Sequence, residues 1–145
     1  MTALTLETAT FRTTEEILAL VRGFEDCTLA RERWTHAAHL TVALWYLTHA
    51  PMNEATERMR RGLQRFIAHH GKQGYHETIT LFWLKLVRHF LDQADANRPL
   101  PDLANELLAR FGNSQFLFAH YSRELVHTAT AKTTWLEPDL RPLEF

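Results

Sequence analysis

The sequence has little of what disulfide-bonded, nucleic-acid-binding and membrane-spanning proteins are built from. Cys27 is the only cysteine, which excludes an internal disulfide and a cysteine-based zinc site. Sixteen Lys and Arg against seventeen Asp and Glu leave a formal net charge of -1, without the basic excess that a phosphate backbone attracts. No stretch approaches the roughly 18 apolar residues of a membrane span. We therefore expect neither nucleic acid nor a membrane as a partner.

The beginning of the sequence also lacks the features of a secretion signal. The residues MTALTLETATFRTTEE show no basic start and no unbroken apolar run. A lone thiol fits a reducing compartment. With 46% hydrophobic and 23% charged residues, the composition is typical of a soluble globular protein. The sequence predicts a cytoplasmic location.

Glycine and proline are scarce, with five of each, and they fall between apolar segments of helical period. No segment alternates apolar and polar residues as a half-buried strand does. These patterns predict an all-α fold, a single domain over residues 1–145. We expect a bundle of five or six helices followed by an extended C-terminal tail with the sequence EPDLRPLEF.

Helix boundaries are predicted from caps and breakers. Thr13 and Glu16 have the spacing of a capping box, Thr35 and Asn53 are candidate N-caps, and Gly71 suits a left-handed C-terminal residue. The five long helices are expected from residue 14 to about 25, 36 to 50, 54 to 70, 75 to 93 and 101 to 111. The fourth carries the widest apolar face, so we expect it at the centre. Two short helices are expected between 115 and 135.

Three histidines carry the strongest functional signal. His36 and His39, in WTHAAHL, are three positions apart and lie on one side of a helix start. The helix dipole there favours the neutral imidazole that metal coordination requires. His76, in YHETITLFW, opens another helix. If the two helix starts meet, the three imidazoles can hold a divalent metal and leave a position open for water or substrate.

Other residues near these histidines are candidates for the same site. Tyr121 is a candidate catalytic proton donor. Glu77 is a second candidate catalytic group if the start of its helix turns it inward, and otherwise it is an exposed first-turn residue favoured by the helix dipole. Thr80 and Trp83 follow His76 at four and seven positions along one helix stripe, and they are candidates for contacting a bound cofactor. The additional candidates that could complete the site are His120 and Glu32.

A structural interpretation of the same histidines stays open. Partly buried imidazoles can bond backbone carbonyls or nearby polar side chains without binding any ligand. The four histidines near predicted helix C-termini, where the dipole favours a cation, are interpreted as structural; they are His49, His69, His70 and His89.

Several motifs resemble those of a family of small bacterial proteins of unassigned function. They are W-T-H-A-A-H-L at 34–40, Y-H-E-T at 75–78, and Y-S at 121–122 with P-D-L-R-P-L at 138–143. The resemblance spans most of the chain. It implies kinship and a shared layout, and it supplies no catalytic role.

Two functions follow from these patterns. The first is a small divalent-metal-dependent enzyme acting on a small molecule, with Zn, Fe or Ni held by His36, His39 and His76. The alternative is a metal-free helical module that binds a small ligand or a protein. The sequence leaves the oligomeric state open.

Overall fold

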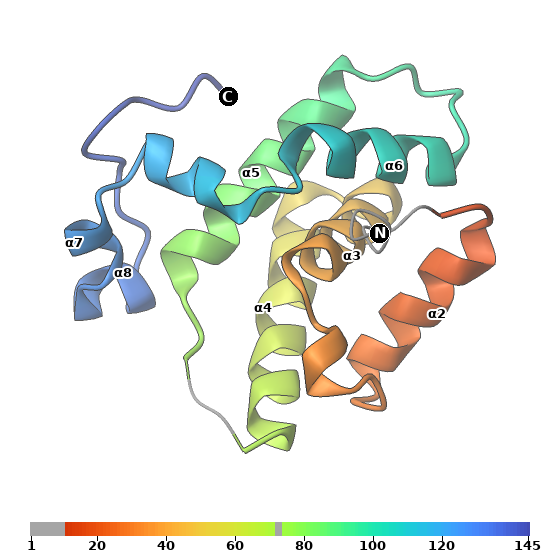
Figure 1. The fold of residues 1–145 in the computed structure, drawn as a ribbon, viewed down its shortest axis with the longest axis horizontal. Coiled ribbons are helices and arrows are strands. Elements are labelled where there is room, and N and C mark those ends of the chain that lie inside the picture. Colours follow the sequence, from red (N-terminus) through yellow and green to blue (C-terminus); the bar gives the residue numbers. More distant parts are fainter. Residues whose placement is uncertain (1–10, 72–73) are drawn as a thin grey trace, which may run out of the picture.

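A computed structural model describes residues 11–71 and 74–145 (Figure 1). These residues form helices and no strand, which confirms the predicted all-α class. The five long helices are α2 (Thr14–Glu25), α3 (His36–His49), α4 (Met52–His69), α5 (Glu77–Gln93) and α6 (Leu100–Phe111). The shorter elements are η1 (Arg31–Arg33), η2 (Ser114–Ala119), α7 (Arg123–Val126) and α8 (Ala129–Thr133).

The centre of the bundle is α3 and not α5, the helix predicted for that place. Helices α2, α4, α5 and α6 all pack against α3. Buried residues occur on every side of α3, from Ala38 to Leu47, as expected for a helix enclosed by others. The apolar face of α5 covers one side of α3 and also meets α4 and α8. The wide apolar face therefore predicted correctly that this face of α5 is buried, and predicted wrongly that α5 is the central helix.

The helix starts follow the predicted capping chemistry with one exception. Thr13 and Glu16 form the capping box of α2, and the Thr35 hydroxyl accepts a hydrogen bond from the Ala38 amide at 3.1 Å. Asn53, however, is not an N-cap. Helix α4 begins at Met52, with Pro51 in an extended conformation at the N-cap position and no side-chain cap.

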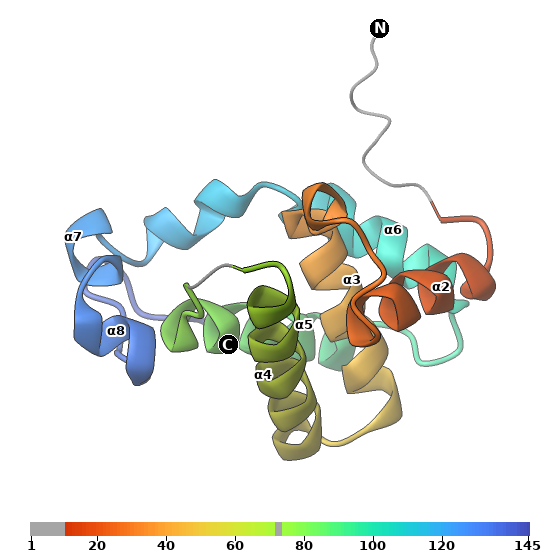
Figure 2. The ribbon, with the colours of Figure 1, turned by 90° about the horizontal axis from the view of Figure 1, so that it is seen from below.

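The chain beyond α6 folds against one end of the bundle. Helices α7 and α8 lie at the opposite end of the molecule from α2 in both ribbon views (Figures 1 and 2). Ser122 and Thr128 are their N-caps. Residues 134–145 then run back along α5 without a helix or strand.

Specific hydrogen bonds attach this tail to the segment around His120. The Tyr121 hydroxyl donates to the Leu136 carbonyl at 2.7 Å, and the Ser122 hydroxyl donates to Asp139 at 2.6 Å. The Leu140 amide donates to the His120 carbonyl at 2.9 Å. The tail is therefore a fixed part of the fold and can form one wall of a site.

Along the described residues, no helix combines the length and apolar character needed to cross a bilayer.

Candidate functional site

His36 joins three helices at the start of α3. Its ring contacts Trp83 of α5 edge-on, with the ring centroids 4.4 Å apart. Its Nε2 lies 3.1 Å from the Phe111 carbonyl at the end of α6. A carbonyl only accepts, so Nε2 carries the proton and donates. Burial lowers the pKa of His36, and the bond to Phe111 opposes that shift in part.

His39, one turn further along α3, lies beside Trp34 with ring centroids 5.7 Å apart. Its Nε2 is shielded from solvent and has no hydrogen-bond partner among the described residues. Burial lowers the pKa of His39 to about 4, and the neighbouring charge of His36 adds to the effect. At neutral pH this imidazole is uncharged, with one ring nitrogen unpaired.

His76 is the N-cap of α5. Its Nδ1 accepts a hydrogen bond from the Ile79 amide at 3.1 Å, and its Nε2 donates to the Val126 carbonyl at 2.7 Å. Burial lowers the pKa of His76 first, and the charges of Lys132 and His127 contribute in the same direction. Both ring nitrogens are therefore in use, and they connect α5 to α7.

The three predicted metal ligands face different neighbours. His36 faces Trp83 and the end of α6, His39 faces Trp34, and His76 faces α7. Across residues 11–71 and 74–145, no group of three or more His, Cys, Asp or Glu side chains is arranged to hold a metal ion. For His76 to become a ligand, it must give up one of its two hydrogen bonds. The three-histidine metal site remains a prediction.

Glu77 belongs to an ion-pair network between α4 and α5. Its carboxylate accepts two hydrogen bonds from Arg60, at 3.1 and 2.7 Å, and one from the Tyr75 hydroxyl at 2.6 Å. These contacts, with Arg60 first, lower the pKa of Glu77. A carboxylate held ionised by three donors is a poor proton acceptor, so its visible role is to fix α4 against α5.

The remaining predicted site residues also have structural partners. Thr80 is buried, and its hydroxyl donates to the His76 carbonyl at 2.7 Å. Trp83 is only 2% exposed and lies in the core. Tyr121 is fully buried, and its hydroxyl holds Leu136 of the tail. Burial raises the pKa of Tyr121 well above its usual range, so this phenol stays protonated at neutral pH.

Glu32 lies in η1 and is exposed. It lines a hollow of about 950 Å³ between α2 and the start of α3, which we call the α2 groove. The polar residues that line this groove are Glu16, Thr28, Glu32, Arg33 and Thr35. One of them, Glu16, already closes the capping box of α2. Neither His36 nor His39 is among the residues that line it.

His120 lines a smaller and more enclosed hollow of about 280 Å³ between α5, α6, η2 and the tail, which we call the α5–α6 cavity. Its walls combine aromatic and aliphatic side chains with polar groups drawn from all four segments. The lining residues are Leu86, His89, Phe90, Gln93, Arg110, Phe111, Phe116, His120, Arg141, Glu144 and Phe145.

The tail fixes the orientation of His120. The ring Nδ1 lies 3.1 Å from the Arg141 carbonyl, and the His120 carbonyl in turn accepts from the Leu140 amide. Because a carbonyl cannot donate, Nδ1 carries a proton, and in the neutral ring Nε2 is then an acceptor. His120 is 4% exposed. The hydrogen bond of its ring is made by Nδ1, and Nε2 is not one of the fully shielded nitrogens without a partner. Nε2 is therefore the ring atom left for a ligand.

Two arginines line the cavity, and each forms a long ion pair with a glutamate. The guanidinium of Arg110 lies over Phe111 at 5.1 Å and over Phe90 at 5.6 Å from the ring centroids. Its nearest carboxylate contact is Glu106 at 3.5 Å, and Arg141 meets Glu144 only at 3.7 Å. Both side chains are more than half exposed, so their donors are free to turn toward a ligand.

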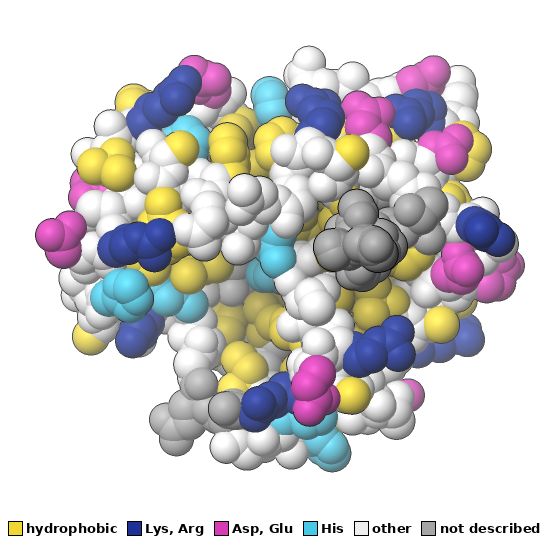
Figure 3. Space-filling model, viewed as in Figure 1, with side chains coloured by type: hydrophobic (Ala, Val, Ile, Leu, Met, Phe, Trp, Pro, Cys, Tyr) yellow, Lys and Arg dark blue, Asp and Glu magenta, His cyan; other side chains and the backbone are white. Residues whose placement is uncertain are grey.

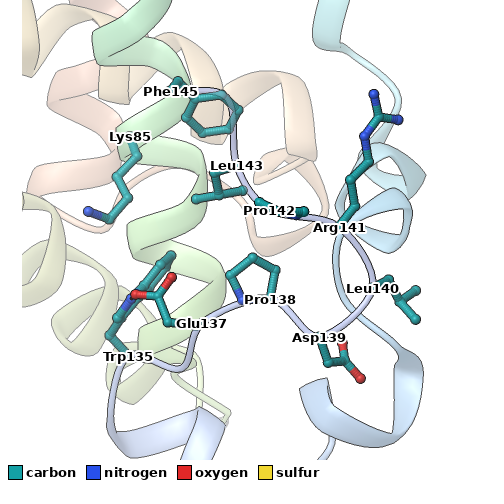
Figure 4. Close-up of a pocket in the computed structure, with 10 residues that line it drawn as sticks. All are labelled: Lys85, Trp135, Glu137, Pro138, Asp139, Leu140, Arg141, Pro142, Leu143 and Phe145. Carbon is teal, nitrogen blue, oxygen red and sulfur yellow. The ribbon is translucent and has the colours of Figure 1, made fainter.

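Arg141 and Phe145 also border a second hollow, of about 550 Å³, between the tail and α5 (Figure 4). This tail groove contains Lys85, whose ammonium lies 5.0 Å from the centre of the Trp135 ring. In Figure 4 the Arg141 side chain points away from Lys85 and Trp135. The tail therefore separates two hollows and turns Arg141 toward the η2 side.

The surface carries no single-signed charged face in the view of Figure 3, where basic and acidic side chains alternate around the rim. The same face is hollowed near its middle. Hydrophobic side chains form the floor of this hollow, and a histidine lies at its edge. This distribution agrees with the near-neutral net charge.

Comparison of the chain with protein families, with curated protein sequences and with solved structures gave no match. The family suggested by the motifs at 34–40, 75–78 and 121–143 therefore remains a prediction.

Sequence reasoning named His120 as a candidate and missed the rest of the α5–α6 cavity. Arg110 and Arg141 belong to segments 31 positions apart, and only the packing of the tail brings them to one hollow. The available signal was Phe116 and Phe118, close to Phe111, which together are more aromatic surface than one short amphipathic turn can bury alone.

Proposed function

We propose that this protein binds a small organic molecule, without a metal ion, in the α5–α6 cavity. The single observation that carries the proposal is that aromatic walls and polar side chains, among them His120 oriented by the tail, surround one hollow. Ligand sites in proteins combine these features, with apolar walls for affinity and polar groups for orientation. This function corresponds to the metal-free alternative predicted from the sequence.

The dimensions support a ligand of modest size. A cavity of about 150 Å³ lined by apolar side chains accommodates benzene. The α5–α6 cavity, at about 280 Å³, has room for one ring with substituents. Its polar groups can then orient those substituents.

A blocking substitution tests the proposal. We expect Gln93→Trp to abolish binding of fragments found by ligand-observed NMR, because Gln93 is exposed in the last turn of α5 and lines the cavity. Asp92→Trp is the matched control, since Asp92 is the exposed neighbour and does not line the cavity. The proposal would be refuted if the two variants bound the fragments equally well. It would also be refuted if no fragment lost binding in Gln93→Trp while keeping it in Asp92→Trp.

A metal-dependent enzyme is the second candidate function. The observation in its favour is the shielded, unpaired Nε2 of His39 beside His36. Such a site would bind Zn, Fe or Ni through imidazole nitrogens. Metal analysis of protein purified without an affinity tag decides between the two candidates. Under the metal-free proposal we expect less than about 0.1 equivalent of metal and a melting temperature that chelators do not change.

A further inference from the structure

The charge of the α5–α6 cavity selects the sign of its ligand. Arg110 and Arg141 supply two positive charges to the lining, and Glu144 supplies one negative charge. His89 and His120 are the other titratable groups that face the cavity. With both imidazoles neutral, the side chains of the lining have a net charge of +1. The two guanidinium groups favour an anion, and their planar shape suits a carboxylate because each can donate two parallel hydrogen bonds.

The walls select the shape of the ligand. Phe111 and Phe116 lie with ring centroids 5.6 Å apart, and Phe116 meets His120 edge-on at 5.4 Å. Phe145 of the tail lies 6.4 Å from the His120 ring. Aromatic side chains arranged around one space favour a further ring in offset or edge-on contact. A volume of about 280 Å³ limits that ring to a single small system.

His120 determines a third feature of the ligand, which is a hydrogen-bond donor. Its Nδ1 proton is held by the Arg141 carbonyl, so its Nε2 accepts and does not donate while the ring is neutral. A ligand that carries a hydroxyl or N–H group on its ring can satisfy this acceptor. Leaving it unpaired in an occupied cavity would cost affinity.

We propose that the occupant of the α5–α6 cavity is a small aromatic carboxylate with a hydrogen-bond donor on its ring. The carboxylate is bound by Arg110 and Arg141, the ring lies among Phe111, Phe116 and Phe145, and the donor bonds Nε2 of His120. This inference rests on the proposed function and names its ligand class.

Titration calorimetry with three matched probes tests the inference. We expect 4-hydroxybenzoate to bind at least tenfold more tightly than the neutral 4-hydroxybenzamide, because the arginines contact a charge only in the former. We expect it to bind about three- to tenfold more tightly than 4-methylbenzoate, which keeps the shape and loses the donor.

Variants assign these effects to residues. Arg141→Gln should weaken 4-hydroxybenzoate by about tenfold, whereas Arg61→Gln, the exposed control on α4, should change nothing. His120→Asn keeps a donor near the Nδ1 position and removes Nε2. It should therefore weaken 4-hydroxybenzoate more than 4-methylbenzoate, and the remaining binding of 4-methylbenzoate shows that the variant is folded.

Three results would overturn the inference, and they differ from failure of the proposed function. The first is that 4-hydroxybenzamide or the cation 4-hydroxybenzylamine binds as tightly as 4-hydroxybenzoate. The second is that Arg141→Gln has no effect, and the third is that His120→Asn weakens both carboxylates equally. If Gln93→Trp still blocks fragments of another class, the cavity binds ligands and only the ligand class is wrong. If it blocks none, the proposed function falls as well.

Discussion

At the scale of single residues, hydrogen-bond partners decide what each histidine does. His76 uses both ring nitrogens to cap α5 and to hold Val126, whereas His39 has an Nε2 that no described residue contacts. His120 lies between these cases, with Nδ1 fixed by the tail and Nε2 left for a ligand. The three imidazoles therefore differ in which of their ring nitrogens are bonded.

His39 gives a prediction on pH. Its folded-state pKa is about 4 against an ordinary 6.5, so the unfolded chain takes up the proton first as pH falls. The stability that neutral His39 contributes is complete above pH 6.5 and is lost as pH falls towards 4. At about 1.4 kcal/mol per unit, the loss is roughly 3 kcal/mol. We expect His39→Leu to remove most of this loss in urea melts between pH 6.5 and 4.

The exposed His49, substituted to Gln, is the control for this measurement. Its substitution should leave the acid-dependent loss as large as in the original protein. If His39→Leu also leaves the loss unchanged, the His39 imidazole is not buried in its neutral form.

At the scale of helices, α2 and α4 approach closely at Gly62. A Cβ atom added there would lie 2.6 Å from Cε2 of Phe24. Phe24 cannot move aside easily, because it is fully buried and stacks on Trp34 with ring centroids 4.3 Å apart. Without this contact, alanine would favour the helix by about 1 kcal/mol. The close approach therefore requires glycine.

We expect Gly62→Ala to destabilise the protein by about 1 kcal/mol or more in denaturant melts, because overpacking costs about 1 to 3 kcal/mol and exceeds the helix-propensity gain. Arg61→Ala, at the exposed neighbouring position, should stay within about 0.5 kcal/mol. A stabilising Gly62→Ala would mean that α2 and α4 are further apart than described.

At the scale of the whole molecule, Trp83 connects the bundle to its C-terminal part. It contacts His36 of α3 and Phe116 of η2, with ring centroids 4.4 and 6.4 Å away. We expect Trp83→Ala to cost about 3 to 5 kcal/mol, because truncating a large buried side chain leaves a cavity. The partly exposed Trp135, substituted to Ala, should cost less. Similar losses in urea melts would contradict a core position for Trp83.

Much of the fold could be predicted because its signals are local. The Thr13 capping box, the Thr35 cap and the left-handed Gly71 depend on residues within one helical turn. The start of α4 at Met52 was missed by two residues, because Pro51 and Asn53 are both plausible start signals and sequence alone does not rank them.

The candidate site was harder to predict, because its members meet only through packing. The sequence identified His36, His39 and His76 as residues at helix starts, and all three do lie there, His36 and His39 in the first turn of α3 and His76 at the N-cap of α5. It could not give their partners. His36 bonds a carbonyl 75 positions away, and His76 bonds one 50 positions away. No local pattern encodes such a contact.

By itself, the sequence determined the helical class, the approximate helix limits and the caps at Thr13 and Thr35, since hydrogen bonds and apolar periodicity within a helix involve neighbours three or four residues apart. The tertiary structure alone decided that α3 is central, that the tail holds His120 by Arg141, and that Arg110 and Arg141 share one cavity. These features depend on how helix faces fit together and on where a chain without regular structure finds its hydrogen-bond partners. Both are properties of the packed molecule, because the contacting groups are separated by many residues along the chain.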